Sequence, residues 1–361
     1  MYIDIEVVDS PVVRAIKSRL NLPGRVVEKA EDVYRQVRSA SDPIQAGKET
    51  LFLTKNRGPF IRSCPGTRAY RCCGYKILHI GTFCSLDCSY CILQSYFHPP
   101  VLQYFVNHSD LIDELEVFLS SEKIQRIGTG EFTDSLIWEP WFPLSAELID
   151  RFAHQSHAVL ELKTKTTNIQ GLKNLPHNQK TIVAWSVNSE YMISGQERHT
   201  ASLEERVMAA ATCERWGYPL AFHFDPLIVY DGCIADYQNV VDRLFSAVSP
   251  SRLVWISLGA FRFTPPLKPL IQRRFPDSTI PYGEFIPGKD GKMRYFKPIR
   301  IELFRAVVDR IRKWAPEVLI YLCMEDDEVW EKTLGFRPFE RAGLSHMLDR
   351  RAAQVCKLSP Q

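Results

Sequence analysis

Long hydrophobic runs are missing from this sequence. No stretch approaches the ~18 consecutive apolar residues that a membrane-spanning helix needs, and the opening Met-Tyr-Ile-Asp-Ile-Glu lacks the basic segment of a signal peptide. The sequence also has little excess of one charge over the other: the net charge of +3 over 361 residues is too small to indicate nucleic-acid binding by the chain as a whole. We therefore expect a cytoplasmic protein with no membrane partner.

Cysteine, by contrast, is plentiful. The chain has ten cysteines, and 45% of its residues are hydrophobic, enough to bury the core of one large enzyme domain. In a reducing compartment, cysteines serve more often as free thiols or metal ligands than as disulfides. The positions of these ten thiols are therefore the first place to look for chemistry.

Three of the cysteines stand close together, Cys84, Cys88 and Cys91, spaced C-x3-C-x2-C after the apolar run 75–80. Such a loop can wrap three thiolates around one cubane iron–sulfur cluster, and it supplies no fourth ligand, so one iron stays open for a substrate or cofactor. We predict a [4Fe-4S] cluster here. The alternatives are a structural zinc site, to which Cys64, Cys72 and Cys73 could contribute, and three unrelated buried thiols.

The loop resembles that of the radical S-adenosylmethionine (SAM) superfamily, because the aromatic Tyr90 precedes the third cysteine and an apolar strand leads in. In that superfamily the open iron holds the amino and carboxylate groups of SAM. The reduced cluster then cleaves SAM to methionine and a 5′-deoxyadenosyl radical. The resemblance implies two cofactors, the [4Fe-4S] cluster and SAM, and an electron donor of the flavodoxin or ferredoxin type.

Apolar segments along the rest of the chain alternate between strand and helix patterns. Expected strands cover 75–80, 124–128, 158–162, 181–187, 220–224 and 253–258, with helical segments between them. This alternation predicts an α/β fold with a parallel sheet, closed as an incomplete (β/α)6 radical-SAM barrel with its chemistry at the carboxyl ends of the strands. We divide the chain into a small N-terminal α/β module (1–60), the barrel (61–325) and a C-terminal extension (326–361).

A second resemblance is more specific. The chain resembles the spore photoproduct lyase family of radical-SAM DNA-repair enzymes and poorly characterised relatives from roughly residue 50 to 325. The resemblance rests on five short segments in the family's order, which are Arg-Ser-Cys-Pro-Gly (62–66), Cys-Cys-Gly-Tyr (72–75), Cys-Ile-Leu-Gln (91–94), Ser-Val-Asn (186–188) and Gly-Tyr-Pro-Leu (217–220). In the best-known member, the adenosyl radical takes a hydrogen from a thymine dimer, and a cysteine later returns one.

The chain departs from that enzyme at the residues that close its cycle. Where the lyase has the hydrogen-donor cysteine after its second barrel strand, this chain has Glu131, and where a tyrosine follows the last cluster cysteine, it has Ile92. The segment that corresponds to the basic DNA-inserting hairpin is expected at 277–288, which holds no lysine or arginine. We therefore expect a related reaction rather than repair of the spore photoproduct itself.

Candidate SAM ligands follow from the same resemblance. Gly130 and Glu131 resemble the glycine-glutamate motif whose carboxylate accepts hydrogen bonds from the SAM ammonium. Thr133, two residues further on, is also a candidate SAM-binding residue. The resemblance implies that Lys165 holds the SAM carboxylate, with Lys163 as the alternative lysine, and that Ser186 holds the ribose. The alternative to SAM binding is that Glu131 and the two lysines are solvent-exposed charges on loops.

Two further residues are candidates for a catalytic role, and one group of residues is a candidate nucleic-acid-binding surface. Tyr90 is the one tyrosine of the lyase relay that persists, and Cys323 follows an apolar strand-like run and could approach the barrel mouth. A surface of basic residues interleaved with aromatic residues would suit binding of DNA or RNA, although a solvent-exposed charged face is the usual alternative. The basic residues are Arg262, Lys268, Arg273, Arg274 and the lysines and arginines of 289–300, and the aromatic residues beside them are Phe261, Phe263, Tyr295 and Phe296. The alternative substrate is a small molecule or peptide.

Overall fold

The computed structural model describes residues 1–67 and 69–359, and its centre is a curved eight-stranded sheet. The strands run in the order β18-β14-β13-β11-β10-β9-β5-β4, and all adjacent pairs are parallel except β4 with β5. Their bounds are Ile61–Ser63 (β4), Lys76–Leu78 (β5), Gln125–Gly128 (β9), Ala158–Thr164 (β10), Thr181–Ser186 (β11), Leu220–Leu227 (β13), Leu253–Ala260 (β14) and Leu319–Leu322 (β18).

The six strands expected from the sequence are all present, and the partial barrel is confirmed. Two strands were missed at its edges, namely β4, which is short and antiparallel, and β18, which adds a seventh parallel strand. Every residue of β11 and β14 is buried. Strands covered on both faces read as continuous apolar runs, which is why the central strands were easy to predict.

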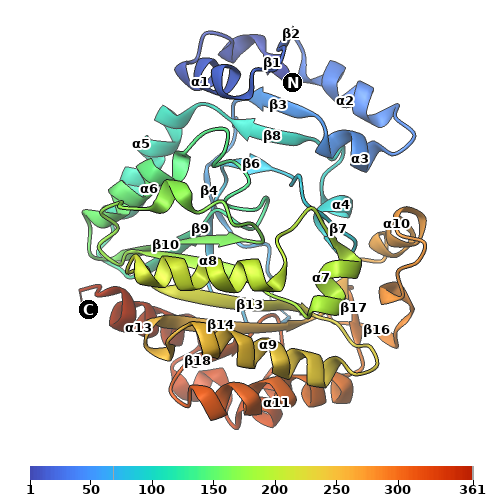
Figure 1. The fold of residues 1–361 in the computed structure, drawn as a ribbon, viewed down its shortest axis with the longest axis vertical. Helices are drawn as coiled ribbons and strands as arrows, with labels where there is room; N and C mark the ends of the chain where they lie inside the picture. Colours follow the sequence, from blue (N-terminus) through green and yellow to red (C-terminus); the bar gives the residue numbers. More distant parts are fainter. Residues whose placement is uncertain (68, 360–361) are drawn as a thin grey trace.

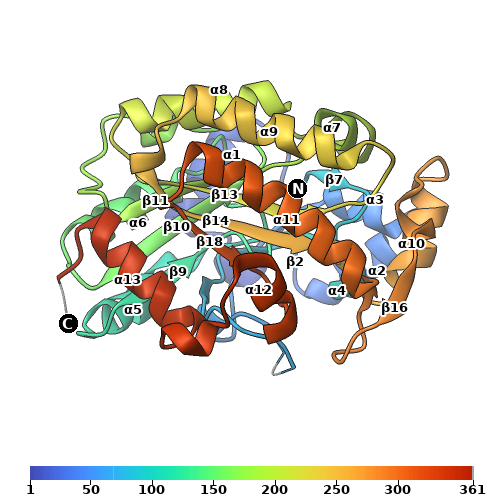
Figure 2. The same cartoon turned by 90° about the horizontal axis from the view of Figure 1, so that it is seen from below.

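Helices cover the outside of the curved sheet, with α8 and α9 lying side by side along one face (Figures 1 and 2). Ser202 and Glu205 form a capping box that starts α8, and each satisfies a backbone N–H that the helix leaves free. The outer helices are α5 (His108–Leu119), α6 (Leu144–Ala153), α7 (Glu190–Gln196), α8 (Leu203–Arg215), α9 (Cys233–Ala247), α11 (Lys297–Trp314), α12 (Asp327–Leu334) and α13 (Leu344–Cys356).

A second sheet of five strands, in the order β2-β1-β3-β8-β6, lies beside the barrel (Figure 1). Its strands are β1 (Tyr2–Asp4), β2 (Arg25–Val27), β3 (Leu51–Thr54), β6 (Gly81–Thr82) and β8 (Leu102–Phe105), accompanied by α1 (Pro11–Leu20), α2 (Ala30–Arg38) and α3 (Pro43–Lys48). The sheet includes β6 and β8, which come after residue 60, so the division of the chain into three parts stays a prediction.

The two edge strands of the barrel, β4 and β18, do not pair with each other in the described chain. The segment between β4 and β5 instead contacts the residues after β18: the Arg71 N–H donates to Glu325 O at 3.2 Å, and the Arg71 guanidinium binds Asp327. This segment, residues 64–67 and 69–75, therefore covers the gap in the barrel. None of the described helices combines the length and hydropathy that crossing a bilayer requires.

Candidate functional site

The three predicted cluster ligands lie on one tightly held loop. It runs from β6 through β7 (Asp87–Cys88) to the short helix α4 (Leu93–Tyr96); Cys84 and Cys88 are buried and Cys91 is half-buried. Lys48 Nζ donates to Cys84 O at 3.1 Å and Leu86 O at 2.5 Å. Gln94 Nε2 donates to Cys88 O and Ser89 O, both at 3.0 Å. These bonds fix the loop backbone on both sides of the cysteines.

Two buried cations, Lys48 and Arg274, lie beside this loop. Lys48 Nζ lies 3.6 Å from Asp87, and Arg274 donates to Asp87 at 3.0 Å, with all three side chains at most 5% exposed. A cluster bound by three thiolates adds negative charge, which buried cations stabilise more strongly than exposed ones. Lys48 and Arg274 were not among the predicted site residues, because they lie 36 or more residues from Cys84 in the sequence.

The described residues form no ready-made site for a single metal ion. All ten cysteines are free, and within residues 1–67 and 69–359 no three His, Cys, Asp or Glu side chains are grouped closely enough to hold one metal ion. A cubane places different demands, because each thiolate binds its own iron. Burial raises the pKa of Cys84 to about 12, and metal binding would remove that proton.

Tyr90 and Lys165, two of the predicted site residues, meet beside the cluster loop. Lys165 Nζ donates to Tyr90 Oη at 3.0 Å and to Glu197 at 2.9 Å, and Tyr90 Oη donates to the same Glu197 carboxylate. Arg206 pairs with Glu197 at 2.5 Å, and neither of these two side chains is exposed. Burial opposes ionisation of Glu197, but Lys165 and Arg206 lower its pKa to about 2. Glu197 thus holds the lysine and the tyrosine in place.

A cavity of about 150 Å³ lies inside the barrel and reaches the carboxyl ends of its strands. Three predicted site residues, Glu131, Ser186 and Cys323, line it together. Other charged lining side chains include Lys163, Asp225 and Arg262 from the strands, and Arg71 from the segment between β4 and β5. Gly130, Thr133, Tyr90 and Lys165 do not line this cavity. Of the predicted SAM and catalytic residues, three therefore line the cavity, while Tyr90 and Lys165 meet beside the cluster loop.

The glycine-glutamate pair has a clear local geometry. Glu131 lies 3.5 Å from Lys163 Nζ, and both side chains are partly exposed, at 32% and 23%. Gly130 has no room for a side chain, because a Cβ there would lie 2.9 Å from Lys163 Cβ and 3.0 Å from Lys163 O. Thr133 is buried just beyond, and its Oγ1 bonds only weakly to Asp134 O at 3.4 Å. Lys163, the alternative lysine, is therefore the one that faces Glu131.

A buried polar chain that the sequence did not indicate forms one wall of the cavity. His223 Nδ1 bonds to Ser257 Oγ at 2.7 Å, and His223 Nε2 bonds to Glu161 at 2.6 Å. The three residues come from β13, β14 and β10, and all three are buried. Each has apolar residues of its strand on both sides, and that break in the apolar pattern was the available signal.

Much of the predicted basic and aromatic surface is buried. Arg274, Arg294 and Arg300 are each at most 5% exposed and pair with Asp42 and Asp87, Asp290 and Glu325, respectively. Phe261, Phe263 and Tyr295 are buried. The charges of these three arginines therefore stabilise the interior, whereas Arg273, Lys289 and Phe296 of the predicted surface are exposed, so a nucleic-acid role for this surface stays a prediction.

The hairpin expected at 277–288 is also displaced. The antiparallel hairpin consists of β16 (Phe285–Pro287) and β17 (Met293–Tyr295), joined by residues 288–292, and β17 also pairs with β15 (Arg262–Phe263). Its turn carries Lys289, which is exposed, and Lys292. This hairpin overlaps the expected segment at 285–288 and presents Lys289 to solvent just beyond it.

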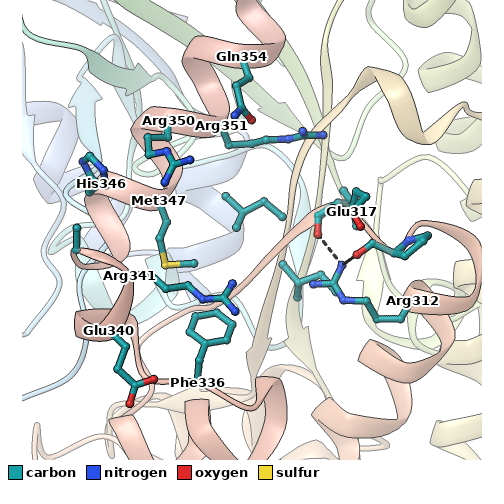
Figure 3. A pocket seen from close by; sticks show the side chains of 15 residues that line it. Arg312, Glu317, Phe336, Glu340, Arg341, His346, Met347, Arg350, Arg351 and Gln354 are labelled. Carbon is teal, nitrogen blue, oxygen red and sulfur yellow. Dashed lines mark hydrogen bonds between the residues drawn. The ribbon is translucent and has the colours of Figure 1, made fainter. Parts of the chain in front are cut away.

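A larger cavity of about 740 Å³ lies at the opposite end of the barrel, between α11, β18 and α13 (Figure 3). Two of its four arginines, Arg312 and Arg351, donate to backbone carbonyls, and Arg341 packs on the Phe336 ring at 3.6 Å. It contains no cysteine and none of the predicted site residues. Its position at the amino ends of β14 and β18 separates it from the candidate site.

Comparison with known proteins gives a consistent answer. Residues 69–297, more than half of the chain, match the spore photoproduct lyase family. The spore photoproduct lyase of Bacillus subtilis (strain 168) is 25% identical over 208 residues, which cover 56% of this chain and 61% of that protein. This chain thus spans about three fifths of the length of that curated relative.

Two solved structures share the fold. One is a cysteine-to-alanine mutant of spore photoproduct lyase with dinucleoside spore photoproduct, at 21% identity and a TM-score of 0.79; the other is a double mutant with bound SAM and the same dinucleoside, at 22% and 0.78. Each match covers 89% of this chain and 98% of the solved one. The half-barrel, the cysteine loop and the sequence match agree, and the chain belongs to the spore photoproduct lyase family, as its motifs predict.

Proposed function

We propose that this protein is a radical-SAM enzyme acting on a nucleic-acid lesion or base, by a reaction distinct from spore photoproduct repair. Cys84, Cys88 and Cys91 would hold a [4Fe-4S] cluster. The observation that carries the proposal is their common loop, whose backbone carbonyls are held by Lys48 and Gln94. When bound, the cluster and SAM supply a 5′-deoxyadenosyl radical, given an electron from a flavodoxin or ferredoxin type of donor.

The chain's own residues would bind and orient SAM. Glu131 accepts hydrogen bonds from the SAM ammonium at the rim of the cavity, where Gly130 and Thr133 shape the backbone. Ser186 holds the ribose from the end of β11. Lys165 binds the SAM carboxylate, and its position beside Tyr90 on the cluster loop supports this role.

The substrate class rests on family membership and on the exposed Lys289 of the hairpin. The relatives named above are, by their names, lyases of the spore photoproduct, and none of them is named for a small-molecule or peptide substrate. Glu131 stands where the lyase has its donor thiol, and a carboxylate cannot give a hydrogen atom to a carbon radical. The reaction therefore cannot end with a hydrogen atom given from this position.

Anaerobic reconstitution with iron, sulfide, SAM and a strong reductant tests the proposal. We expect 5′-deoxyadenosine from the wild type and none from Cys88→Ala. With dinucleoside spore photoproduct as probe, we expect no release of thymidine, whereas nucleosides from mixed damaged DNA should exchange hydrogen with 5′-deoxyadenosine. Absence of 5′-deoxyadenosine under all these conditions would refute radical-SAM activity, and efficient repair of the dinucleoside would refute the distinct reaction.

A further inference from the structure

Four of the ten cysteines line the same cavity as Glu131: Cys64, Cys72, Cys73 and Cys323. The first three belong to the segment that covers the gap between β4 and β18, and Cys64 N–H donates to Tyr75 O at 3.1 Å, at the amino end of β5. Cys323 alone follows a barrel strand at its carboxyl end, directly after β18. That is the end of the barrel where Glu131 and Ser186 lie.

Cys323 is held in a defined position. Its backbone N–H donates to Leu258 O at 2.8 Å, which continues the pairing of β18 with β14. Its Sγ accepts a hydrogen bond from Arg262 Nη2 at 3.4 Å, and Arg262 is itself paired with Asp225 at 3.2 Å. Because Asp225 lies on β13, the sulfur is anchored to three neighbouring strand ends.

We propose that Cys323 is the hydrogen-atom donor of this site, in place of the thiol that Glu131 replaces. The proposal rests on the proposed function. A carbon radical of the substrate takes the hydrogen atom of the Cys323 thiol, so that a C–H bond forms, the S–H bond breaks and a thiyl radical stays on Cys323. A small thiol of the glutathione class then restores Cys323 by giving up one hydrogen atom, and two of the resulting radicals join as a disulfide.

The protonation states separate Cys323 from Cys72, but not from Cys64, because burial also raises the pKa of Cys64 to about 11. A hydrogen-atom donor has to carry its hydrogen at neutral pH. Burial raises the pKa of Cys323 to about 12, although Arg262 acts against this rise. Cys72 is exposed, and a hydrogen bond from Cys73 lowers its pKa to about 5. Cys72 is therefore a thiolate with no hydrogen atom to give, whereas Cys323 is a thiol.

The first test uses the protein without its cluster. Iodoacetamide reacts with thiolates, so peptide mass spectrometry at pH 7 should find Cys72 alkylated at least about tenfold faster than Cys323. The Cys73→Ala variant should slow alkylation of Cys72, because it removes the hydrogen bond that stabilises the thiolate. Alkylation of Cys323 as fast as Cys72 at pH 7 would contradict a protonated donor.

The second test uses reconstituted enzyme in D2O without substrate. Under these conditions the 5′-carbon radical takes a hydrogen atom from a thiol that lies close enough to it. A thiol exchanges its hydrogen with D2O, so wild-type 5′-deoxyadenosine should carry deuterium, and Cys323→Ser, which keeps the size of the side chain, should lose most of it. Cys64→Ala, Cys72→Ala and the core control Cys213→Ala should keep it. Full deuterium content in Cys323→Ser overturns the donor role, whereas no 5′-deoxyadenosine from the wild type overturns the proposed function and this proposal with it.

Discussion

Lys165 Nζ donates a hydrogen bond to Tyr90 Oη at 3.0 Å, across 75 residues of sequence. Both side chains also bond to Glu197, which Arg206 holds from the other side. The backbone of Glu197 pairs with Cys88 as well, since β12 (Glu197–Arg198) lies antiparallel to β7. One buried carboxylate thus links the cluster loop, the relay tyrosine and the lysine that we assign to SAM.

Replacing Glu197 with glutamine should be strongly destabilising. The change leaves Arg206 buried without a charged partner, and breaking such a pair costs ~3–5 kcal/mol. Urea unfolding of the cluster-free protein measures the loss. Glu190→Gln is the matched control, because Glu190 pairs with Arg243 while 64% exposed, and it should change the unfolding free energy by less than about 1 kcal/mol. Equal losses in the two variants would contradict the role of burial.

Alanine at Cys84, Cys88 or Cys91 should each abolish the cluster. No other thiol lies on the loop to replace the missing ligand, and the remaining cysteines are held elsewhere. Iron and sulfide analysis after reconstitution measures the loss, and SAM cleavage should disappear with it. Cys213→Ala and Cys356→Ala, both fully buried outside the site, should retain the cluster; normal iron content in a triple variant of the loop would exclude it as the ligand set.

Glu131→Gln should weaken SAM binding while the cluster still assembles. The substitution keeps the shape but removes the charge that pairs with the SAM ammonium, a loss of ~1.5–3 kcal/mol in binding free energy. Equilibrium dialysis of reconstituted enzyme with labelled SAM gives the affinity. Glu122→Gln, on the exposed turn before β9, serves as the control. Unchanged SAM affinity with altered products would move Glu131 from cofactor binding to the substrate.

Lys289→Ala should weaken DNA binding equally for all sequences. A lysine at the hairpin turn that contacts a phosphate releases about one counterion, so its loss should lower the slope of log affinity against log salt by about 0.9. Fluorescence anisotropy with a labelled duplex at several salt concentrations measures this slope. Lys123→Ala, in the turn that leads into β9 at the other end of the barrel, should leave it unchanged, and the same result for both lysines would argue against the hairpin.

His79 should make the protein sensitive to acid. Burial lowers its pKa to about 3, and its ring packs against Phe105 and Phe132, each at 4.9 Å. The unfolded chain binds a proton near its ordinary pKa of about 6.5, so stability falls as the pH drops from there toward 3. His79→Phe should flatten this fall by up to ~1.4 kcal/mol per pH unit, measured by urea unfolding between pH 7 and 4. His154, which is 70% exposed, provides the control: His154→Gln should leave the pH dependence of stability as in the wild type.

Local features of the sequence were enough to predict the fold family and the cluster loop. The spacing of Cys84, Cys88 and Cys91 is a property of one short loop, and the central strands are apolar runs because helices or the barrel interior cover both faces. Of the edge strands, β4 was missed because only one of its three residues is apolar. The strand-like run before Cys323 was not counted in the barrel, because its pairing as β18 with β14 depends on residues far away in the sequence. The motif at 72–75 is likewise a short pattern of neighbouring residues, so it could be recognised without knowing which residues it contacts.

Only the tertiary structure decided which charged and thiol side chains meet. Arg274 looked like part of a basic surface, but it is buried against Asp87, 187 residues away in the sequence. Lys163 and Lys165 could not be told apart until the end of β10 directed one to Glu131 and the other to Tyr90. Cys323 and Glu131 share a cavity because strand register brings the carboxyl ends of β18 and β9 to the same end of the barrel. Such pairings depend on long-range packing, which leaves no periodic pattern in the sequence.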